Sequence, residues 1–427
     1  MLTREENELL TRTGPETPGG ALLRCYWQPA ALAEELPPGG APLPVRLLGE
    51  DLVLFRDEEG RPGLLGLHCA HRGADLSYGR IEDGGLRCLY HGWLYDVTGQ
   101  CREQPGEPAG STFCQRVRQP AYPCHEVAGI IFAYLGPGEP PLLPAYELFT
   151  VPEAYRFAPT KSFHDCSYLQ ANEGNIDPVH LPFLHRLRPG ARAARPTPGS
   201  AVSHDALLQS DVRPTIEIDE TDFGLRIYAV RRAGPEEAYV RITNFVMPNL
   251  CAIAGSTGQD GYQIDWHVPI DDTCHWKYTM GFRRSAPVDP GARLRGEAIT
   301  TGYRRVRNAG NRYLQDRTQM GDASFSGMGT NFLDHDAFAV ESQGPVQDRT
   351  RERLGATDRA VILARQMLLR AIAAVQAGAD PPHVVRDAET NRFDHLIVRS
   401  EVVPSAVDWR TYWQPAAAAG QPVGGRS

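Results

Sequence analysis

The fold of the front of this chain is decided by two short stretches, Leu67-His68-Cys69-Ala70-His71-Arg72-Gly73 and Cys88-Leu89-Tyr90-His91-Gly92-Trp93. Each holds one cysteine and one histidine, spaced C-x-H in the first and C-x2-H in the second, with 16 residues between His71 and Cys88. Two thiolates and two imidazoles on paired loops can hold a [2Fe–2S] cluster, with cysteine on one iron and histidine on the other. Neutral imidazoles leave the cluster less negative, so it accepts an electron more easily.

A structural zinc site is the alternative for these four residues, since zinc also takes two cysteines and two histidines. Zinc fingers and ribbons pair cysteine with cysteine and histidine with histidine, whereas both pairs here are mixed. The spacing therefore favours the iron–sulfur cluster. The remaining cysteines make no second ligand set, and we interpret them as ordinary thiols.

Composition sets limits on the class of protein. The chain has 427 residues, a net charge of -8 and 41% hydrophobic residues, which indicates a folded protein of two domains and argues against nucleic acid as a partner. No leader segment and no long apolar run is visible, so we expect a cytoplasmic protein without a membrane span. Of the 44 basic residues only Lys161 and Lys277 are lysine, a skew that we interpret as compositional bias without functional weight.

Apolar runs and turn residues divide the chain. Strands are expected at 45–48, 52–55 and 129–135, before a Pro/Gly-rich linker at 136–144. We therefore expect an all-β domain over residues 1–140, with its core at about 25–135, a mixed domain over 141–413, and a disordered tail over 414–427. Within the second domain, strands are expected at 225–230 and 238–242, and a helix from an N-cap at Thr357 to Gly378.

A second group of ligand-type residues lies in the motif Asp177-x2-His180-x4-His185. Asp177 and His180 are expected to share a helix face. His180 and His185 are about 140° apart on a regular helix, so they can converge only if the helix breaks, and Pro182 is expected to break it.

Two histidines and one carboxylate form the facial triad of non-haem Fe(II) oxygenases. The carboxylate must come from elsewhere, and Asp336 is the best candidate, although Asp334, His335 or Glu341 could serve by chemistry alone. Taken by itself, the motif is more often a pair of unconnected structural histidines. The cluster motif upstream favours iron, because a one-electron relay and an oxygen-activating metal belong together.

With both motifs present, the chain resembles the catalytic α subunit of Rieske non-haem iron oxygenases, in the phthalate-dioxygenase-like branch. The resemblance covers nearly all of the chain. Ala74 and Tyr90 stand where the respiratory-complex Rieske proteins carry two further cysteines. The match of residues 343–349 to this branch sets the alignment that selects Asp336 as the third iron ligand. We assign no role to Glu173. The supporting stretches are 2–7, 26–30, 46–53, 91–96 and 343–349.

The resemblance implies an α+β protein with an N-terminal all-β Rieske [2Fe–2S] domain and a C-terminal helix-grip catalytic domain built on an antiparallel sheet. It also implies a homotrimer or stacked hexamer in which Asp177 bridges the cluster of one subunit to the iron of the next. A separate flavin and iron–sulfur reductase would supply electrons from NAD(P)H. The implied ligands are Cys69, His71, Cys88 and His91 for the cluster, and His180, His185 and Asp336 for the mononuclear iron.

The function implied is an oxygenase component that uses O2 to hydroxylate or O-demethylate an aromatic substrate, with an aromatic carboxylate expected. Arg241 could bind that carboxylate, although one more exposed arginine on a strand is at least as good an interpretation. Two other function classes stay open: an electron-transfer Rieske protein without oxygenase activity, and a zinc-stabilised binding module.

Overall fold

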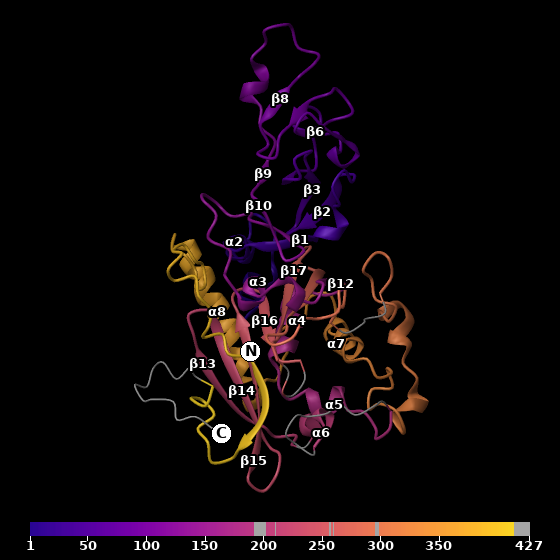
Figure 1. Ribbon diagram of the computed structural model, residues 1–427, viewed down its shortest axis with the longest axis vertical. Coiled ribbons are helices and arrows are strands. Elements are labelled where there is room, and N and C mark those ends of the chain that lie inside the picture. The colour runs from indigo at the N-terminus through magenta and orange to yellow at the C-terminus, as the bar shows by residue number, and fades with distance from the viewer. Residues whose placement is uncertain (192–201, 210, 256–257, 259, 295–298, 414–427) are drawn as a thin grey trace.

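The computed structural model describes the chain except for residues 192–201, 210, 256–257, 259, 295–298 and 414–427. It is an α+β structure, as expected, with small sheets at one end and a large sheet covered by helices at the other (Figure 1). The tail expected to be disordered lies outside the described residues.

Three small antiparallel sheets form the N-terminal part, with strand orders β1-β11-β10, β2-β3-β4-β9 and β5-β6-β7-β8. The strands expected at 45–48, 52–55 and 129–135 overlap β2, β3 and β11, with ends that differ by one or two residues. The bounds are β1 Gln28–Leu32, β2 Leu43–Leu47, β3 Glu50–Arg56, β4 Pro62–Gly66, β5 Arg80–Glu82, β6 Gly85–Arg87, β7 Leu94–Tyr95, β8 Cys101–Glu103, β9 Ala121–Tyr122, β10 Cys124–Val127 and β11 Ile130–Ala133.

The large sheet has the strand order β12-β18-β17-β16-β15-β14-β13, with β19 paired to β15, and all its pairs are antiparallel. The strands expected at 225–230 and 238–242 lie within it. The bounds are β12 Thr160–His164, β13 Thr215–Glu220, β14 Gly224–Arg232, β15 Glu237–Val246, β16 Leu250–Ile253, β17 Gln263–Pro269, β18 His275–Gly281 and β19 Arg399–Pro404.

Helices α4 (Tyr168–Ile176) and α8 (Arg359–Gln376) pack on this sheet, and α7 (Phe332–Glu341) packs on α4. Helix α4 packs on β15, β16 and β17, α8 packs on β14, and α4 touches both other helices, so one helical layer lies over the sheet. Helices α1 (Arg4–Thr11) and α2 (Pro18–Arg24) pack against α8. The shorter helices are α3 Glu147–Thr150, α5 Leu181–Leu184 and α6 His204–Gln209, and the 3-10 turns are Ala33–Glu35, Leu76–Tyr78, Phe113–Arg116, Glu153–Tyr155, Ala309–Leu314, Arg317–Met320 and Ala356–Asp358.

The start of α8 differs from the expectation. Thr357 lies inside a 3-10 turn, and the helix begins two residues later, with Asp358 as the residue before it. Such a turn commonly precedes a helix, and sequence signals place helix ends only to within a few residues. The far end is as expected, because Gly378 has φ +80°, which favours glycine and stops the helix. Among the helices described, none is long and apolar enough to cross a membrane.

Candidate functional site

The two Cys/His loops fold in the same way. The N–H of Cys69 donates to the carbonyl of Ala74 at 2.8 Å, and the N–H of Cys88 donates to that of Trp93 at 2.8 Å. Four residues after each cysteine, a glycine N–H donates back to the cysteine carbonyl, and both glycines have φ near +75°. The two loops therefore have equivalent backbone geometry and present their cysteine and histidine side chains in the same way. The C-x-H and C-x2-H spacing alone does not establish this.

The sulfur side of this pair of loops is buried and the imidazole side is exposed. Cys69 and Cys88 are each 3% exposed, within a small core that includes Tyr95, whose hydroxyl lies 3.2 Å from Sγ of Cys69. The rings of His71 and His91 are exposed, with centroids 4.5 Å apart. Two buried thiols and two outward imidazoles suit a [2Fe–2S] cluster whose histidine side meets an electron-transfer partner.

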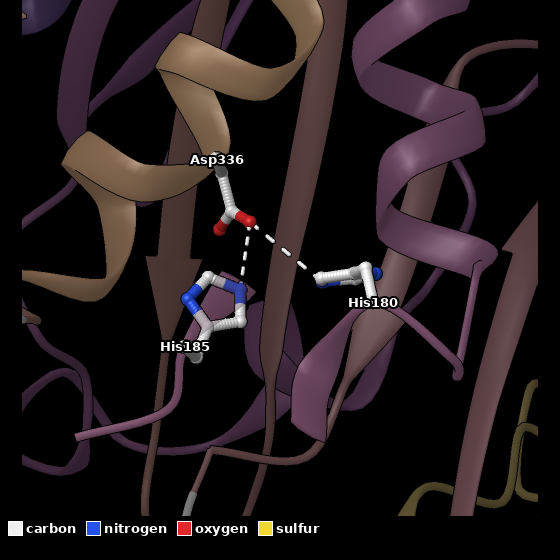
Figure 2. A group of neighbouring side chains, drawn as sticks. All are labelled: His180, His185 and Asp336. Atoms are coloured by element: carbon white, nitrogen blue, oxygen red, sulfur yellow. Dashed lines mark ion pairs between the residues drawn. The ribbon is translucent and has the colours of Figure 1, made fainter. Parts of the chain in front are cut away.

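A second cluster of ligand-type side chains lies under α7, where Asp336 meets His180 and His185 (Figure 2). Oδ1 of Asp336 is 2.9 Å from Nε2 of His185 and 3.7 Å from Nε2 of His180. One ligand atom from each residue lies within 4.8 Å of the other two. The three residues can therefore hold one metal ion.

The local reason for this convergence differs from the expected one. Pro182 does not break a helix between the histidines, because it occupies the first turn of α5, where a missing N–H costs no helical hydrogen bond. The break lies earlier, between the end of α4 at Ile176 and the start of α5 at Leu181. His180 and His185 flank this single turn of helix and so reach the same point.

Asp177 also departs from the expected helix face. It follows α4 with extended backbone, at φ -85° and ψ 114°, rather than sharing a helix with His180. The pair still meets, because Oδ2 of Asp177 lies 3.4 Å from Nδ1 of His180, and Oδ1 accepts the N–H of Val179 at 2.7 Å. Burial would raise the pKa of Asp177, but the contacts with the His180 imidazole and the N–H groups of Val179 and His180 together outweigh it and lower that pKa.

The other candidates for the third ligand are engaged elsewhere. Asp334 faces Arg305 and Arg307 at 3.7 and 3.4 Å. A carboxylate oxygen of Glu341 accepts the hydroxyl of Tyr313 at 2.8 Å, and Nε2 of His335 lies 3.1 Å from the carbonyl of Gly329. Asp336 is therefore the carboxylate that the geometry favours.

The protonation states of His185 and Asp336 suit a metal. Burial lowers the pKa of the His185 imidazole to about 4, so the ring is neutral at pH 7. Burial would raise the pKa of Asp336, but His185 and His180 outweigh it and lower that pKa. Metal binding needs deprotonated ligands, and both groups already meet that condition. Among the described residues, neither buried ring nitrogen of His185 has a partner in a well-formed hydrogen bond, which fits the role of a metal ligand.

The metal-ligand cluster opens into a cavity of about 320 Å³, which Asp177, His180 and Asp336 line. Two smaller cavities adjoin it, both of which Asp336 and Arg241 line. Arg241 comes from β15, and its Nη1 is buried without a hydrogen-bond partner in the described part of the chain. The expectation that Arg241 is one more exposed arginine is therefore wrong.

Sequence reasoning overlooked two sets of buried residues near the site. Glu173, given no role, lies between Arg349 and Arg365, with closest contacts of 3.0 and 2.6 Å, and so joins α4 to α8. Lys277 lines the cavity beside Asp336. The only sequence signal of Glu173 is that it is a carboxylate within a stretch of otherwise neutral residues. The only signal of Lys277 is that it is one of two lysines in the chain.

Comparison with known proteins defines the class. The model of the Rieske [2Fe-2S] domain matches residues 26–123, and that of the LigXa C-terminal domain like family matches residues 133–422. The chain belongs to the Rieske non-haem iron oxygenases, in the branch of phthalate 4,5-dioxygenase. It is an oxidoreductase that incorporates oxygen, and its cofactors are a Rieske [2Fe–2S] cluster and a mononuclear non-haem iron. An electron-transfer protein without oxygenase activity and a zinc module are both disfavoured.

Particular relatives support this assignment. The chain is 37% identical over 426 residues to the oxygenase subunit of phthalate 4,5-dioxygenase from Pseudomonas putida, covering 96% of this chain and 95% of that protein. It is 32% identical to the oxygenase subunit of 5,5'-dehydrodivanillate O-demethylase from Sphingobium sp., covering 92% and 85%. The structure of dicamba monooxygenase bound to dicamba shares the fold, with a TM-score of 0.59 at 19% identity over 84% of this chain and 99% of that one.

Proposed function

We propose that this chain is the oxygenase component that oxidises an aromatic carboxylate by ring hydroxylation or O-demethylation. The observation that carries the substrate class is Arg241. Its guanidinium lines the cavity beside Asp336 and has a buried nitrogen without a hydrogen-bond partner among the described residues. A half-buried guanidinium with a spare donor calls for an anion, and guanidinium matches a carboxylate with two parallel hydrogen bonds.

The ligand assignment is part of the proposal. Cys69, His71, Cys88 and His91 would hold the cluster, and His180, His185 and Asp336 would hold the mononuclear iron. The iron supplies the site at which O2 is activated, with open positions for O2 and substrate.

The surrounding residues keep this site in place. Asp177 fixes the ring of His180 through Nδ1, so that Nε2 faces Asp336. The ring of Phe332 stacks on that of His185 with centroids 3.4 Å apart and so limits its rotation.

In either reaction the electrons balance. Two electrons from NAD(P)H, delivered by a separate reductase, accompany each O2. In dihydroxylation both oxygen atoms enter the ring as a cis-diol. In O-demethylation one oxygen atom enters the methyl group, which leaves as formaldehyde with a phenol as product, and the other oxygen becomes water. Relatives of both kinds are similar to this chain, so the product has to be measured.

The positions of the two sites support electron transfer between subunits. The cluster loops lie beside β6, at the opposite end of the molecule from α5, the single helical turn that His180 and His185 flank (Figure 1). We infer a head-to-tail homotrimer, or a stacked hexamer of two trimers, in which the cluster of one subunit meets Asp177 of the next. An oxygenase and ferredoxin complex of carbazole 1,9a-dioxygenase is among the proteins of similar fold. We also keep the domain division near residue 140 as a proposal.

A screen of aromatic acids tests the function. The reconstituted protein is supplied with NAD(P)H and a surrogate reductase, and O2 uptake is measured together with the product, as cis-diol or as formaldehyde plus phenol. Uptake of O2 coupled to product for an aromatic acid, and not for its amide, supports the proposal. O2 uptake that yields only peroxide for every acid tested would contradict it.

A further inference from the structure

Asn175 lies where the cavities around the metal-ligand cluster meet. It lines all three of them, and Asp336 is the only other described residue that does so. It lies in the last turn of α4, two residues before Asp177. Asparagine is a weaker helix former than alanine or leucine, so helix formation alone does not account for this residue. Its contacts with the cavity wall account for it instead.

The nitrogen end of the Asn175 amide faces the sheet. Nδ2 lies 2.8 Å from Nε2 of His267 and 3.4 Å from Oδ2 of Asp265. Both partners come from β17, one of the strands on which α4 packs. An amide nitrogen carries two hydrogens, so both of them are directed at this strand.

A row of hydrogen bonds behind the amide decides which of its ends faces the sheet. The carbonyl of Cys166 can only accept, so Nδ1 of His275 donates to it at 2.7 Å. Burial lowers the pKa of His275 to about 3, which keeps the ring neutral and leaves Nε2 as an acceptor. Nδ1 of His267 therefore donates to that Nε2 at 3.2 Å. His267 is neutral as well, since burial holds its pKa well below the usual value, so its own Nε2 accepts from Asn175.

The oxygen end of the amide is left for the cavities. Oδ1 lies on the other side of the amide from the hydrogens that His267 and Asp265 accept, and it has no hydrogen-bond partner among the described residues. Turning the amide over would place this oxygen against two acceptors, so the orientation is fixed. The half-buried Asn175 therefore presents a hydrogen-bond acceptor to a ligand in the cavities.

Arg241 shares both smaller cavities with Asn175. Arg241 comes from β15 and Asn175 from the helix that packs on the sheet, so the two residues reach one ligand from different walls. A cation on one wall and a neutral acceptor on another suit an aromatic acid that also carries a hydrogen-bond donor. The wall of one of these cavities includes apolar side chains that suit a ring, namely Ile227, Ala229, Ile253 and Phe332.

We propose that Asn175 determines substrate specificity by accepting a hydrogen bond from a hydroxyl group on the ring, so that the preferred class is a hydroxylated aromatic acid. The carboxylate of this substrate pairs with Arg241, and its hydroxyl group donates to Oδ1 of Asn175. His267 and His275 are positioning residues, which hold the amide in one orientation and do not touch the substrate. This inference rests on the proposed function and names the substrate class of the same site.

Anaerobic calorimetry on the reconstituted holoenzyme tests this inference, with benzoate, 3- and 4-hydroxybenzoate and the two matching fluorobenzoates as probes. Fluorine is close to hydroxyl in size but cannot donate. In the wild type, at least one hydroxybenzoate should bind roughly 3- to 10-fold more tightly than its fluoro counterpart, the usual effect of one neutral hydrogen bond. Asn175→Leu should bring this ratio to within about twofold and leave benzoate binding within about threefold.

Variants of His267 separate recognition from folding. His267→Phe removes the acceptor that holds the amide, so the amide can turn over, and the ratio of hydroxybenzoate to fluorobenzoate binding should fall while benzoate binding is kept. His267→Gln offers both a donor and an acceptor and should keep most of the ratio. The control is Gln343→Leu, which removes another amide that lines only the large cavity and should leave the ratio unchanged.

Two results would overturn the inference: equal binding of each hydroxybenzoate and its fluoro counterpart by the wild type, or equal weakening of all the probes in Asn175→Leu. An enzyme that oxidises aromatic acids without any preference for the hydroxyl group would refute the role of Asn175 and leave the proposed function standing. An enzyme that binds and oxidises no aromatic acid would refute both.

Discussion

Oδ1 of Asp336 lies 2.9 Å from Nε2 of His185, which joins α7 to the end of α5 at the point where His180 also arrives (Figure 2). Asp336→Ala should therefore remove the mononuclear iron and leave the cluster intact. Iron analysis together with the visible spectrum of the cluster measures both. The matched control is Asp334→Asn, on the same helix but paired with Arg305 and Arg307, and it should keep all the iron. Loss of iron in the control but not in Asp336→Ala would refute the ligand assignment.

Asp177→Asn should uncouple the two metal sites. The amide keeps the shape of the carboxylate but not its charge or its hold on His180, so both metals should bind while turnover falls by roughly 100-fold or more. Stopped-flow oxidation of the reduced cluster in the presence of substrate measures the transfer step directly. Asp222→Asn, at an exposed ion pair with His395, serves as the control. Turnover near the wild-type level with full metal content would rule out the bridge.

Arg241→Met should raise the KM for an aromatic acid by roughly 10- to 100-fold, because a charge-assisted pair in a buried cavity is lost. The KM for the corresponding methyl ester should change little, since the ester carries no charge. Arg232→Met removes an exposed arginine of the neighbouring strand β14 and should change neither value. If the ester and the acid respond equally, Arg241 acts through packing and not through the carboxylate.

Acid should destabilise the protein through its buried histidines. Burial lowers the pKa of His383 from 6.5 to about 4, so the unfolded chain takes up this proton more readily than the folded one. Stability is unaffected above pH 6.5 and falls as the pH drops from 6.5 toward 4, by at most about 3 kcal/mol from this residue. His383→Gln, which can keep a hydrogen bond to Tyr146, should show a smaller drop in Tm between pH 7 and pH 5. An unchanged drop would show that His383 does not contribute.

The sequence was most informative where the chemistry is local. The Cys69/His71 and Cys88/His91 loops could be predicted because each binding motif occupies a few consecutive residues. The strands at 225–230 and 238–242 followed from apolar periodicity. The position of the helix break could not be predicted, because Pro182 is compatible both with a break and with a first helical turn. The ion pair of Lys277 with Asp265, at 3.1 Å, depends on the register of β17 and β18, which no local pattern specifies.

The central claim is that one chain holds both an iron–sulfur cluster and a separate iron. Analysis of iron, acid-labile sulfide and zinc in the anaerobically reconstituted protein tests it most directly. We expect a red-brown protein with a two-iron, two-sulfide cluster and one further iron per chain, the last of which is lost in Asp336→Ala. A colourless protein, or one that takes up zinc and no sulfide, would contradict the account.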